Sequence, residues 1–532
     1  MITLCSAQSV RLAASRLVSK ICCLSAVVCS LNLPLAPNAS CPTIRNITSF
    51  GTQLPTLSAR GSLTSTENSP SPAVISVKPF GNYFTTTNNT RRRLPSTFSA
   101  QFGNNMSVKD RSVAVLSNGR ANGYEPKLER AEGFIRLFMV GDVMLGRGVD
   151  QILPYHCDPK LYEDYVKDAQ EYVDLAVRVN GPLPPHRGMD YIWGDALHIF
   201  ERLRPDLKII NLETAVTTSD TPWPSKGINY RMHPKNVDTL ATAGIDCAVL
   251  SNNHILDWDY AGLEETLATL EAAKIKTAGA GRRDSDAQLP AVISVTKANH
   301  LSEVQSTTRL EGDYHRLLVF GLGHSSSGIP TSWKATSRKA GVNYIRYDSI
   351  GDFQSLKATI SEYRQPGDLV VISIHWGGNW GFELESGQRQ FAHRLIDEAG
   401  VDVVHGHSSH HIKGVEVYQG KLIAYGCGDF LTDYEGIQSY GGIGKKAALH
   451  DNYSFMYFVD LDPETGHVVN LTFVPMELRQ LRVIRALPNT GAYRWLYDNM
   501  SRECLALGKR GIVKEKLDNG LDVFKLDLRE AA

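Results

Sequence analysis

The stretch 401–430, VDVVHGHSSHHIKGVEVYQGKLIAYGCGDF, constrains this chain more than any other segment. The apolar run 401–404 predicts a buried strand that leads directly into His405-Gly406-His407-Ser408-Ser409-His410-His411. Four histidines within these seven residues exceed what packing requires, and imidazole is a common metal ligand. Open α/β sheets keep their sites at the ends of their strands. The stretch therefore predicts half of a metal site, and the other half must come from elsewhere in the chain.

Length and charge limit the classes of protein to consider. A chain of 532 residues has room for two to four domains. Residues 1–105 carry nine basic residues and a single acid, Glu67, which leaves 47 basic and 55 acidic residues for 106–532. Residues 106–532, called the body here, are thus mildly acidic and have no basic stripe, so nucleic acid is not an expected partner. No apolar run reaches the length of a membrane span, and the sequence leaves the oligomeric state open.

The cysteines do not predict a disulfide framework. Five of the nine lie within 1–105, and the body has only Cys157, Cys247, Cys427 and Cys504, which are far apart and form no Cys-x-x-Cys pair. This spacing is typical of a protein with isolated thiols.

Residues 1–105 are interpreted apart from the body. They are rich in Ser, Thr and Asn, and Arg11, Arg16 and Lys20 precede a short apolar run. This composition is typical of an organelle transit peptide or a secretory signal, and equally of a disordered tail or of sequence upstream of a start at Met106. The expected location is accordingly the cytoplasm for the body alone, or an organelle or secretory route if 1–105 is a genuine leader.

Ligand-type side chains recur where predicted strands of the body end. Strand 134–140 is followed by Asp142, strand 207–210 by Glu213, strand 246–250 by Asn253 and His254, and strand 368–374 by His375. A turn aspartate or an Asn-Asn turn is unremarkable alone, but the repetition indicates one shared edge. His324, His393, His405 and His411 are interpreted as strand-end or packing residues instead.

The residues at these strand ends suit a pair of divalent ions. Carboxylates, an amide and imidazoles are ligands for Mn, Fe or Zn, and we expect the set Asp142, Glu213, Asn253, His375, His407 and His410. Two such ions can activate a water and hold the oxygens of an in-line displacement. His254, next to the ligand Asn253, is then placed to protonate a leaving group. Charge alone suggests that Arg147, Lys226 and Arg231, with Lys413, contact an anionic substrate.

Six segments together resemble the CapA/PgsA family of bacterial capsule and poly-γ-glutamate synthesis proteins. They are GDVMLGR, NLE, SNNHILD, HWG, GHSSH and YGCGDF, and the loop GINYRMHP adds to them. The resemblance covers about 133–480, and a helix and strand in 481–532 are expected to pack on that domain. The family is similar to calcineurin-like metallophosphoesterases, which implies an α/β fold with a four-layer α/β/β/α sandwich.

The resemblance also implies roles for particular residues. Asp142 matches the first-strand aspartate, and Glu213 stands where a bridging acid is expected. Asn253 and His254 match the Asn-His pair, and His375, His407 and His410 match the remaining histidine ligands. The chain departs from the phosphoesterase pattern at Met144, where that pattern has a histidine, and its final motif is GHxxH where the pattern has GHxH.

Two functions follow as expectations. The first is a metal-dependent hydrolase that uses a metal-activated water on a phosphoester-like or related anionic substrate. The second is a non-catalytic accessory or scaffold protein for the synthesis or export of an anionic polymer, poly-γ-glutamate. The expected partner is a small molecule or an anionic polymer in either case. Binding of the polymer without turnover would distinguish the second function from the first.

Overall fold

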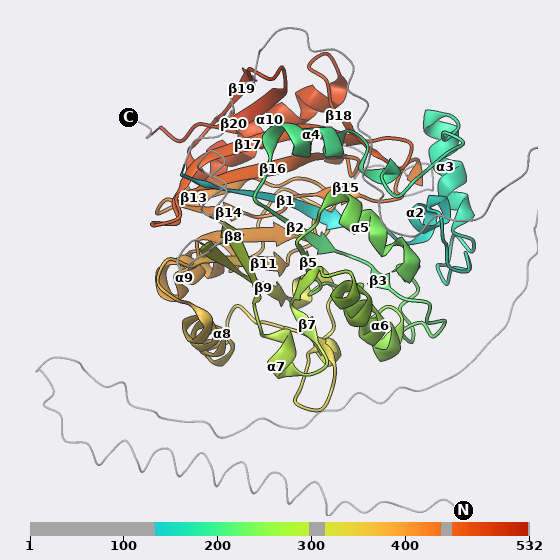
Figure 1. Ribbon diagram of the computed structural model, residues 1–532, viewed down its shortest axis with the longest axis horizontal. Coiled ribbons are helices and arrows are strands. Elements are labelled where there is room, and N and C mark those ends of the chain that lie inside the picture. Colours follow the sequence, from blue (N-terminus) through green and yellow to red (C-terminus); the bar gives the residue numbers. More distant parts are fainter. Residues whose placement is uncertain (1–132, 297–313, 438–448, 530–532) are drawn as a thin grey trace, which may run out of the picture. The chain divides into compact units, whose positions relative to one another are not determined.

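The computed structural model describes residues 133–296, 314–437 and 449–529. The segment 1–105 lies outside these residues, so the alternatives for it stay predictions. Within the described residues, most strands belong to a ten-stranded sheet, called here the larger sheet, or to a six-stranded sheet, called the smaller sheet (Figure 1). The α/β class predicted from the sequence is confirmed.

The larger sheet follows the order β19-β20-β17-β16-β1-β2-β5-β6, with β15 paired to β1 and β18 to β17. Its strands are β1 (Ile135–Val143), β2 (Leu207–Leu212), β5 (Cys247–Val249), β6 (Lys276–Ala278), β15 (Asp429–Leu431), β16 (Tyr453–Leu461), β17 (Val468–Leu478), β18 (Val483–Arg485), β19 (Ile512–Lys516) and β20 (Asp522–Leu526). Strands β1, β2, β5 and β6 pair in parallel, whereas β16 to β20 pair antiparallel.

The smaller sheet follows the order β13-β14-β12-β11-β9-β8. Its strands are β8 (Ala291–Thr296), β9 (Tyr314–Gly323), β11 (Leu369–His375), β12 (Val403–His407), β13 (Val415–Tyr418) and β14 (Lys421–Ala424). Strands β9, β11, β12 and β14 are parallel, and β8 and β13 close the two edges antiparallel. Two short pairs stand apart: β3 (Ala215–Val216) with β4 (Arg231–Met232), and β7 (Ala280–Gly281) with β10 (Gly341–Val342).

The helices connect these strands. They are α2 (Arg147–Ile152), α3 (Gln170–Asn180), α4 (Asp195–Leu203), α5 (Asp238–Ala243), α6 (Asp259–Ala272), α7 (Asp284–Ala287), α8 (Ile350–Tyr363), α9 (Gln388–Ala399) and α10 (Gly491–Gly508). Short 3₁₀ turns are η2 (Tyr191–Trp193), η3 (Pro234–Val237), η5 (Ser325–Ser327) and η6 (Thr331–Trp333).

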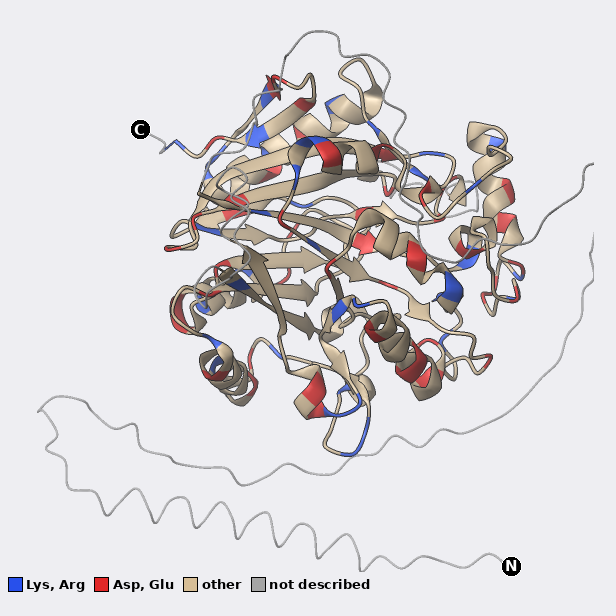
Figure 2. Ribbon diagram, in the orientation of Figure 1, with Lys and Arg blue, Asp and Glu red and all other residues tan. Residues whose placement is uncertain are grey.

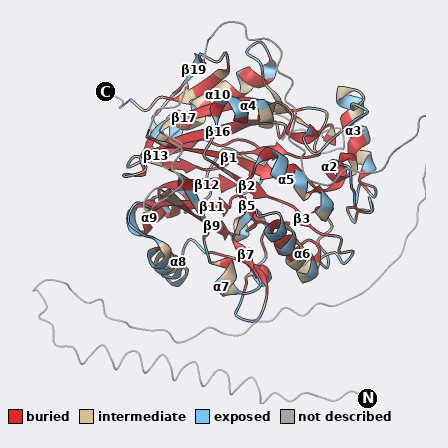
Figure 3. Ribbon diagram, viewed as in Figure 1, coloured by how far each residue is buried: buried red, intermediate tan, exposed pale blue. Residues whose placement is uncertain are grey.

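Alternating side chains divide the core into layers. Successive side chains of a strand point to opposite faces. In β1, Leu137 and Met139 join an apolar cluster that also contains Val319 of β9 and Val371 of β11, so this cluster lies between the two sheets. The intervening residues of β1 belong to a cluster shared with α4, α5 and α6, and the other face of the smaller sheet packs on α8 and α9. Figure 3 shows the strands buried and the outward faces of these helices exposed.

The described part of the C-terminal segment, 481–529, packs against both sheets. Strands β19 and β20 extend the larger sheet beyond β17, and α10 contributes Leu496 and Met500 to the cluster between the sheets. The domain boundary expected at residue 480 stays a prediction. Figure 2 shows Lys, Arg, Asp and Glu concentrated on helices and loops, with few on the central strands. Among the described residues, no helix is both long enough and apolar enough to cross a bilayer.

Strand register brings the predicted ligands together. Asp142 lies near the end of β1, and parallel pairing sets it opposite Asp429 of β15. In the smaller sheet, His375 and His407 are the last residues of β11 and β12 and are opposite each other in the ladder. Parallel strands end at the same edge of a sheet, so the polar residues that follow them gather there.

Candidate metal centre

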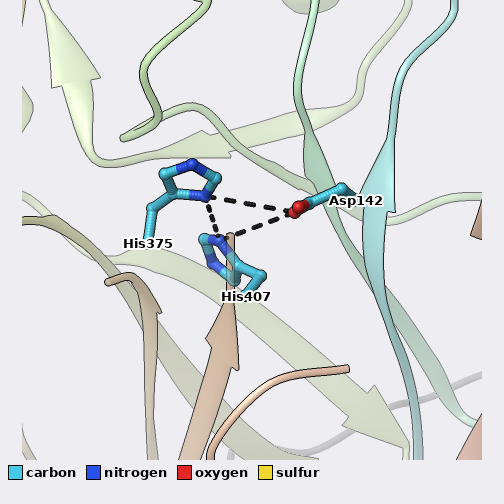
Figure 4. A group of neighbouring side chains, drawn as sticks. All are labelled: Asp142, His375 and His407. Carbon is cyan, nitrogen blue, oxygen red and sulfur yellow. Dashed lines mark hydrogen bonds and ion pairs between the residues drawn. The ribbon is translucent and has the colours of Figure 1, made fainter. Parts of the chain in front are cut away.

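Asp142, His375 and His407 form one group of potential metal ligands. Their side chains come from different strands and point toward one another (Figure 4). Nδ1 of His375 lies 2.8 Å from Nδ1 of His407, and Oδ1 of Asp142 lies 4.0 and 3.9 Å from these two nitrogens. Atoms at such separations can surround one ion with bonds of about 2.0–2.2 Å. All three side chains are buried.

The Nε2 atoms of His375 and His407 also have polar contacts. Nε2 of His375 lies 3.0 Å from the amide oxygen of Asn253, and Nε2 of His407 lies 3.0 Å from the hydroxyl of Ser373. Such contacts fix the ring orientation and the tautomer of a ligand histidine. Burial lowers the pKa of both imidazoles well below the ordinary value, and neighbouring histidines add to this effect. Both rings are therefore neutral at pH 7, as metal ligation requires.

A second group consists of Asp142, His410 and Asp429. Nδ1 of His410 lies 3.1 Å from each carboxylate oxygen of Asp429. Burial alone would lower the pKa of His410, but the Asp429 carboxylate outweighs burial and raises it. His410 is 12% exposed, so this group lies closer to the surface than the first. Asp142 belongs to both groups and is the residue they share.

The carboxylates of the centre crowd one another. Burial, followed by repulsion from Asp429, raises the pKa of Asp142 well above its ordinary value. The pKa of Glu213 is also raised well above its ordinary value, first by burial and then by repulsion from Asp142 and Asp429. Like charges in a buried site cannot all ionise unless a cation neutralises them. Divalent ions supply that charge, so the donor set fits the metals that the sequence implies.

Glu213 and Asn253 lie beside the first group. Oε1 of Glu213 is 3.7 Å from Nε2 of His375, and the Asn253 amide oxygen contacts the same nitrogen. Glu213 belongs to neither ligand group, whereas Asp142 belongs to both. The bridging role expected for Glu213 from the resemblance, and the ligand role expected for Asn253, both stay predictions.

His254 is oriented by a carboxylate. Its Nδ1 lies 2.7 Å from Oδ2 of Asp257, while its Nε2 faces Oε1 of Glu213 at 3.9 Å. Burial is the main reason that the pKa of His254 falls to about 4, although Asp257 opposes the shift. A neutral imidazole that donates from Nδ1 keeps a lone pair on Nε2. Proton exchange at His254 is thus directed to Nε2.

The three predicted substrate-contacting cations lie in different environments. Lys226 is 17% exposed, and its Nζ lies 2.7 Å from Oδ1 of Asp257, beside His254. The Arg147 side chain is only 1% exposed and pairs with Glu163 and Asp433. Their contact with substrate stays a prediction.

Arg231, the third of these cations, is held by its own loop. It bonds to Ser219 O and to the Asp220 carboxylate, and it covers the Trp258 ring at 3.9 Å. Its contact with substrate likewise stays a prediction. Lys413 donates from Nζ to the carbonyl of Glu383.

Three residues near the ligands did not stand out in the sequence. Asp429 follows Gly428 after an apolar run, the same pattern that identified Asp142, and could have been found that way. Asn211 donates from Nδ2 to Oδ1 of Asp142 at 2.7 Å, and its own oxygen accepts from Asn252 at 3.1 Å. The backbone N–H of Ser408 donates to the other oxygen of Asp142. These bonds orient the shared carboxylate.

The four histidines that the sequence left outside the ligand set, His324, His393, His405 and His411, occupy packing positions. His405 lies within β12, and its Nε2 donates to the carbonyl of Val140. His411 is buried and accepts from the backbone N–H of Gly381. His324 stacks on Tyr347, and His393 stacks on Tyr418 beside Glu416.

Replacing Asp429 with asparagine tests the second group alone. We expect the stoichiometry of bound metal to fall by about one ion per chain, because the amide cannot supply the charge that this group needs. The first group should keep its ion. Elemental analysis of the purified variant and wild type measures the difference, and an unchanged stoichiometry would argue against a site at His410 and Asp429.

The chain is similar in sequence to a known protein family and to several known proteins. Residues 136–434 match the family described as bacterial capsule synthesis protein PGA_cap. The chain is 38% identical over 390 residues to a "Probable polyglutamine synthesis accessory protein" of two Mycobacterium tuberculosis strains, covering 73% of this chain and 96% of the relative. It is 25% identical over 295 residues to "PGA biosynthesis protein CapA" of Bacillus subtilis, covering 55% of this chain and 62% of that relative.

Proposed function

The chain belongs to the bacterial capsule synthesis protein family PGA_cap, and from this premise we propose that it is a metal-dependent hydrolase of an anionic, phosphoester-like substrate. The observation that carries the proposal is the pair of potential ligand groups that share Asp142. Bound Mn, Fe or Zn ions would activate a water and neutralise the anionic oxygens of the substrate. The raised pKa values of Asp142 and Glu213, caused first by burial, support a site that a cation completes.

The proposal includes the arrangement of the layers. We take the two sheets and their helices to form the four-layer α/β/β/α sandwich of calcineurin-like metallophosphoesterases. The support is one apolar cluster between the sheets and one on the outer face of each sheet. In this arrangement the ligands come from the strand ends of both sheets, so each sheet contributes to one site.

The residues around the ligand groups take separate roles in this proposal. His254 would take up a proton at Nε2 and give it to the leaving group, and the Asp257 carboxylate at Nδ1 would stabilise the imidazolium between these two steps. Lys226 places a positive charge next to that ring and is partly exposed, so it is the best supported of the predicted substrate-contacting cations. Asn253 and Glu213 complete the ligand set beside His375.

Metal removal tests the hydrolase directly. The full chain, purified in the presence of Mn²⁺, should hydrolyse a generic aryl phosphoester, and EDTA should abolish the activity. Readdition of Mn²⁺, Fe²⁺ or Zn²⁺ should restore it. EDTA should also lower the melting temperature, since a ligand that binds only the folded state stabilises it. Two results together would contradict the proposal. The purified protein would contain no stoichiometric metal, and its melting temperature would change neither with EDTA nor with added ions.

The second candidate is a non-catalytic accessory protein for an anionic polymer. It is favoured by the description of the Mycobacterium tuberculosis relatives as synthesis accessory proteins. This function predicts that the chain binds poly-γ-glutamate and leaves its length unchanged. Gel filtration of the polymer after incubation measures its length. Phosphoester hydrolysis that depends on His254 would favour the hydrolase over this alternative.

A further inference from the structure

Two tyrosine hydroxyls, those of Tyr230 and Tyr434, form a hydrogen-bonded pair next to the candidate centre. Their oxygens are 2.6 Å apart. The Tyr230 ring stacks on the His254 imidazole, with ring centroids 3.8 Å apart. The Tyr434 ring meets the His410 imidazole edge-on at 5.4 Å. The tyrosine pair therefore joins the histidine that exchanges protons to a histidine of the second ligand group.

Buried charges hold the tyrosine pair in place. The Arg147 guanidinium lies 4.7 Å from the Tyr230 ring centroid and 5.3 Å from that of Tyr434. Arg147 is itself fixed by ion pairs with Glu163 and Asp433, the second of which precedes Tyr434 in the chain. Because the fixed Arg147 lies against both rings, the tyrosine hydroxyls are already oriented before a ligand binds, which lowers the entropic cost of binding. The arginine predicted from the sequence to contact substrate thus lies against the rings of both tyrosines.

One proton of the tyrosine pair has no acceptor among the residues that the structure describes. A bond between two hydroxyls uses only one of their two O–H groups. No other hydrogen bond of either hydroxyl occurs in 133–296, 314–437 or 449–529. A largely buried donor without an acceptor costs free energy until water or a ligand accepts from it. The second O–H is thus available beside both His254 and His410.

We propose that the tyrosine pair donates this hydrogen bond to a phosphoryl oxygen of the ligand bound at the candidate metal centre. The inference rests on the proposed function, from which it takes the anionic substrate, and it adds a residue pair that selects the substrate. A ligand must then present an oxygen acceptor to the hydroxyls while its other oxygens face the ligand groups. Phenylalanine at either position keeps the ring contacts and removes only the hydroxyl.

Inorganic phosphate is the probe for this contact. Its affinity for the full chain loaded with Mn²⁺ is measured by calorimetry for wild type, Tyr230→Phe, Tyr434→Phe and the double variant. We expect phosphate to bind the double variant about 10- to 100-fold more weakly, which is the cost of one hydrogen bond to a charged group. Bound Mn²⁺ per chain should stay unchanged, because neither tyrosine is in a ligand group. Tyr155→Phe, which removes a hydroxyl from a side chain 45% exposed, is the matched control.

Each outcome has one meaning. Equal phosphate affinity in wild type and the double variant overturns the inference, and so does a wild type that carries Mn²⁺ but binds no phosphate. Loss of Mn²⁺ from either single variant overturns it as well, because the tyrosines would then support the ligands. Phosphate binding that weakens in the double variant, in a protein that hydrolyses no phosphoester, would sustain the inference and reject the hydrolase.

Discussion

Asp142→Asn is expected to abolish metal binding at both ligand groups. Asp142 is the residue that the groups share, so one substitution removes a ligand from each. Losing a partner that only orients a ligand costs about 10- to 100-fold in metal affinity, and losing a shared ligand should cost more. Metal analysis of the variant should therefore find less than one ion per chain. Phosphoester hydrolysis by the wild type, where present, should vanish with the metal.

The same substitution is expected to stabilise the metal-free protein. Burial, and then the nearby Asp429, raise the pKa of Asp142 above its unfolded value. The folded state thus binds the proton more tightly, and the free energy of unfolding falls as pH rises from about 4 toward neutrality. Asparagine removes that penalty. Without metal, Asp142→Asn should melt at a higher temperature than wild type at pH 8, and the difference should shrink at pH 5.

An exposed acid provides the control for both effects. Asp164 lies on the surface and has no ion pair among the described residues, so Asp164→Asn should change neither the metal content nor the pH dependence. Two results would count against the reasoning on Asp142. One is a variant that retains both ions, and the other is a metal-free variant less stable than wild type at pH 8.

The sequence was sufficient to find most of the potential ligands because they follow one rule. Parallel strands end at a common edge, and Asp142, His375, His407 and His410 each lie at or just beyond such an end. An apolar run followed by a ligand-type residue marks that position without knowledge of the fold. The α/β class followed from the same runs, since strands buried on both faces are almost continuously apolar.

Other features could not be predicted from the sequence, because they depend on pairing between distant segments of the chain. The apolar run before Gly428 marks Asp429 as a possible strand-end acid, but only the register of the three-residue strand β15 against β1 shows that it lies opposite Asp142. The assignment of β1 and β11 to different sheets likewise depends on contacts across the core. Helix α8 was missed because its apolar positions are diluted by polar residues, and a buried face is visible only once the smaller sheet is present. The surroundings of Arg147 could not be predicted either, because sequence alone cannot show that Glu163 and Asp433 lie beside it.

Replacing His254 with alanine should separate chemistry from metal binding. His254 belongs to neither ligand group, and its Nδ1 is held by Asp257, so Nε2 is the atom that can exchange a proton with substrate. Removing a positioned acid or base typically costs about 10²- to 10⁴-fold in rate. We expect kcat on the aryl phosphoester to fall by that range, while metal content stays at the wild-type value.

A comparison with other variants decides whether His254 acts chemically or only by packing. His198→Ala, at a side chain 77% exposed, should leave kcat unchanged. Asp257→Asn should lower kcat less than His254→Ala, because the imidazole remains and loses only its orienting carboxylate. If His254→Ala instead removes metal in proportion to activity, the ring supports the ligands and the proton-transfer role is wrong. If it retains full kcat with full metal content, Nε2 takes no part in the reaction, and a water must protonate the leaving group.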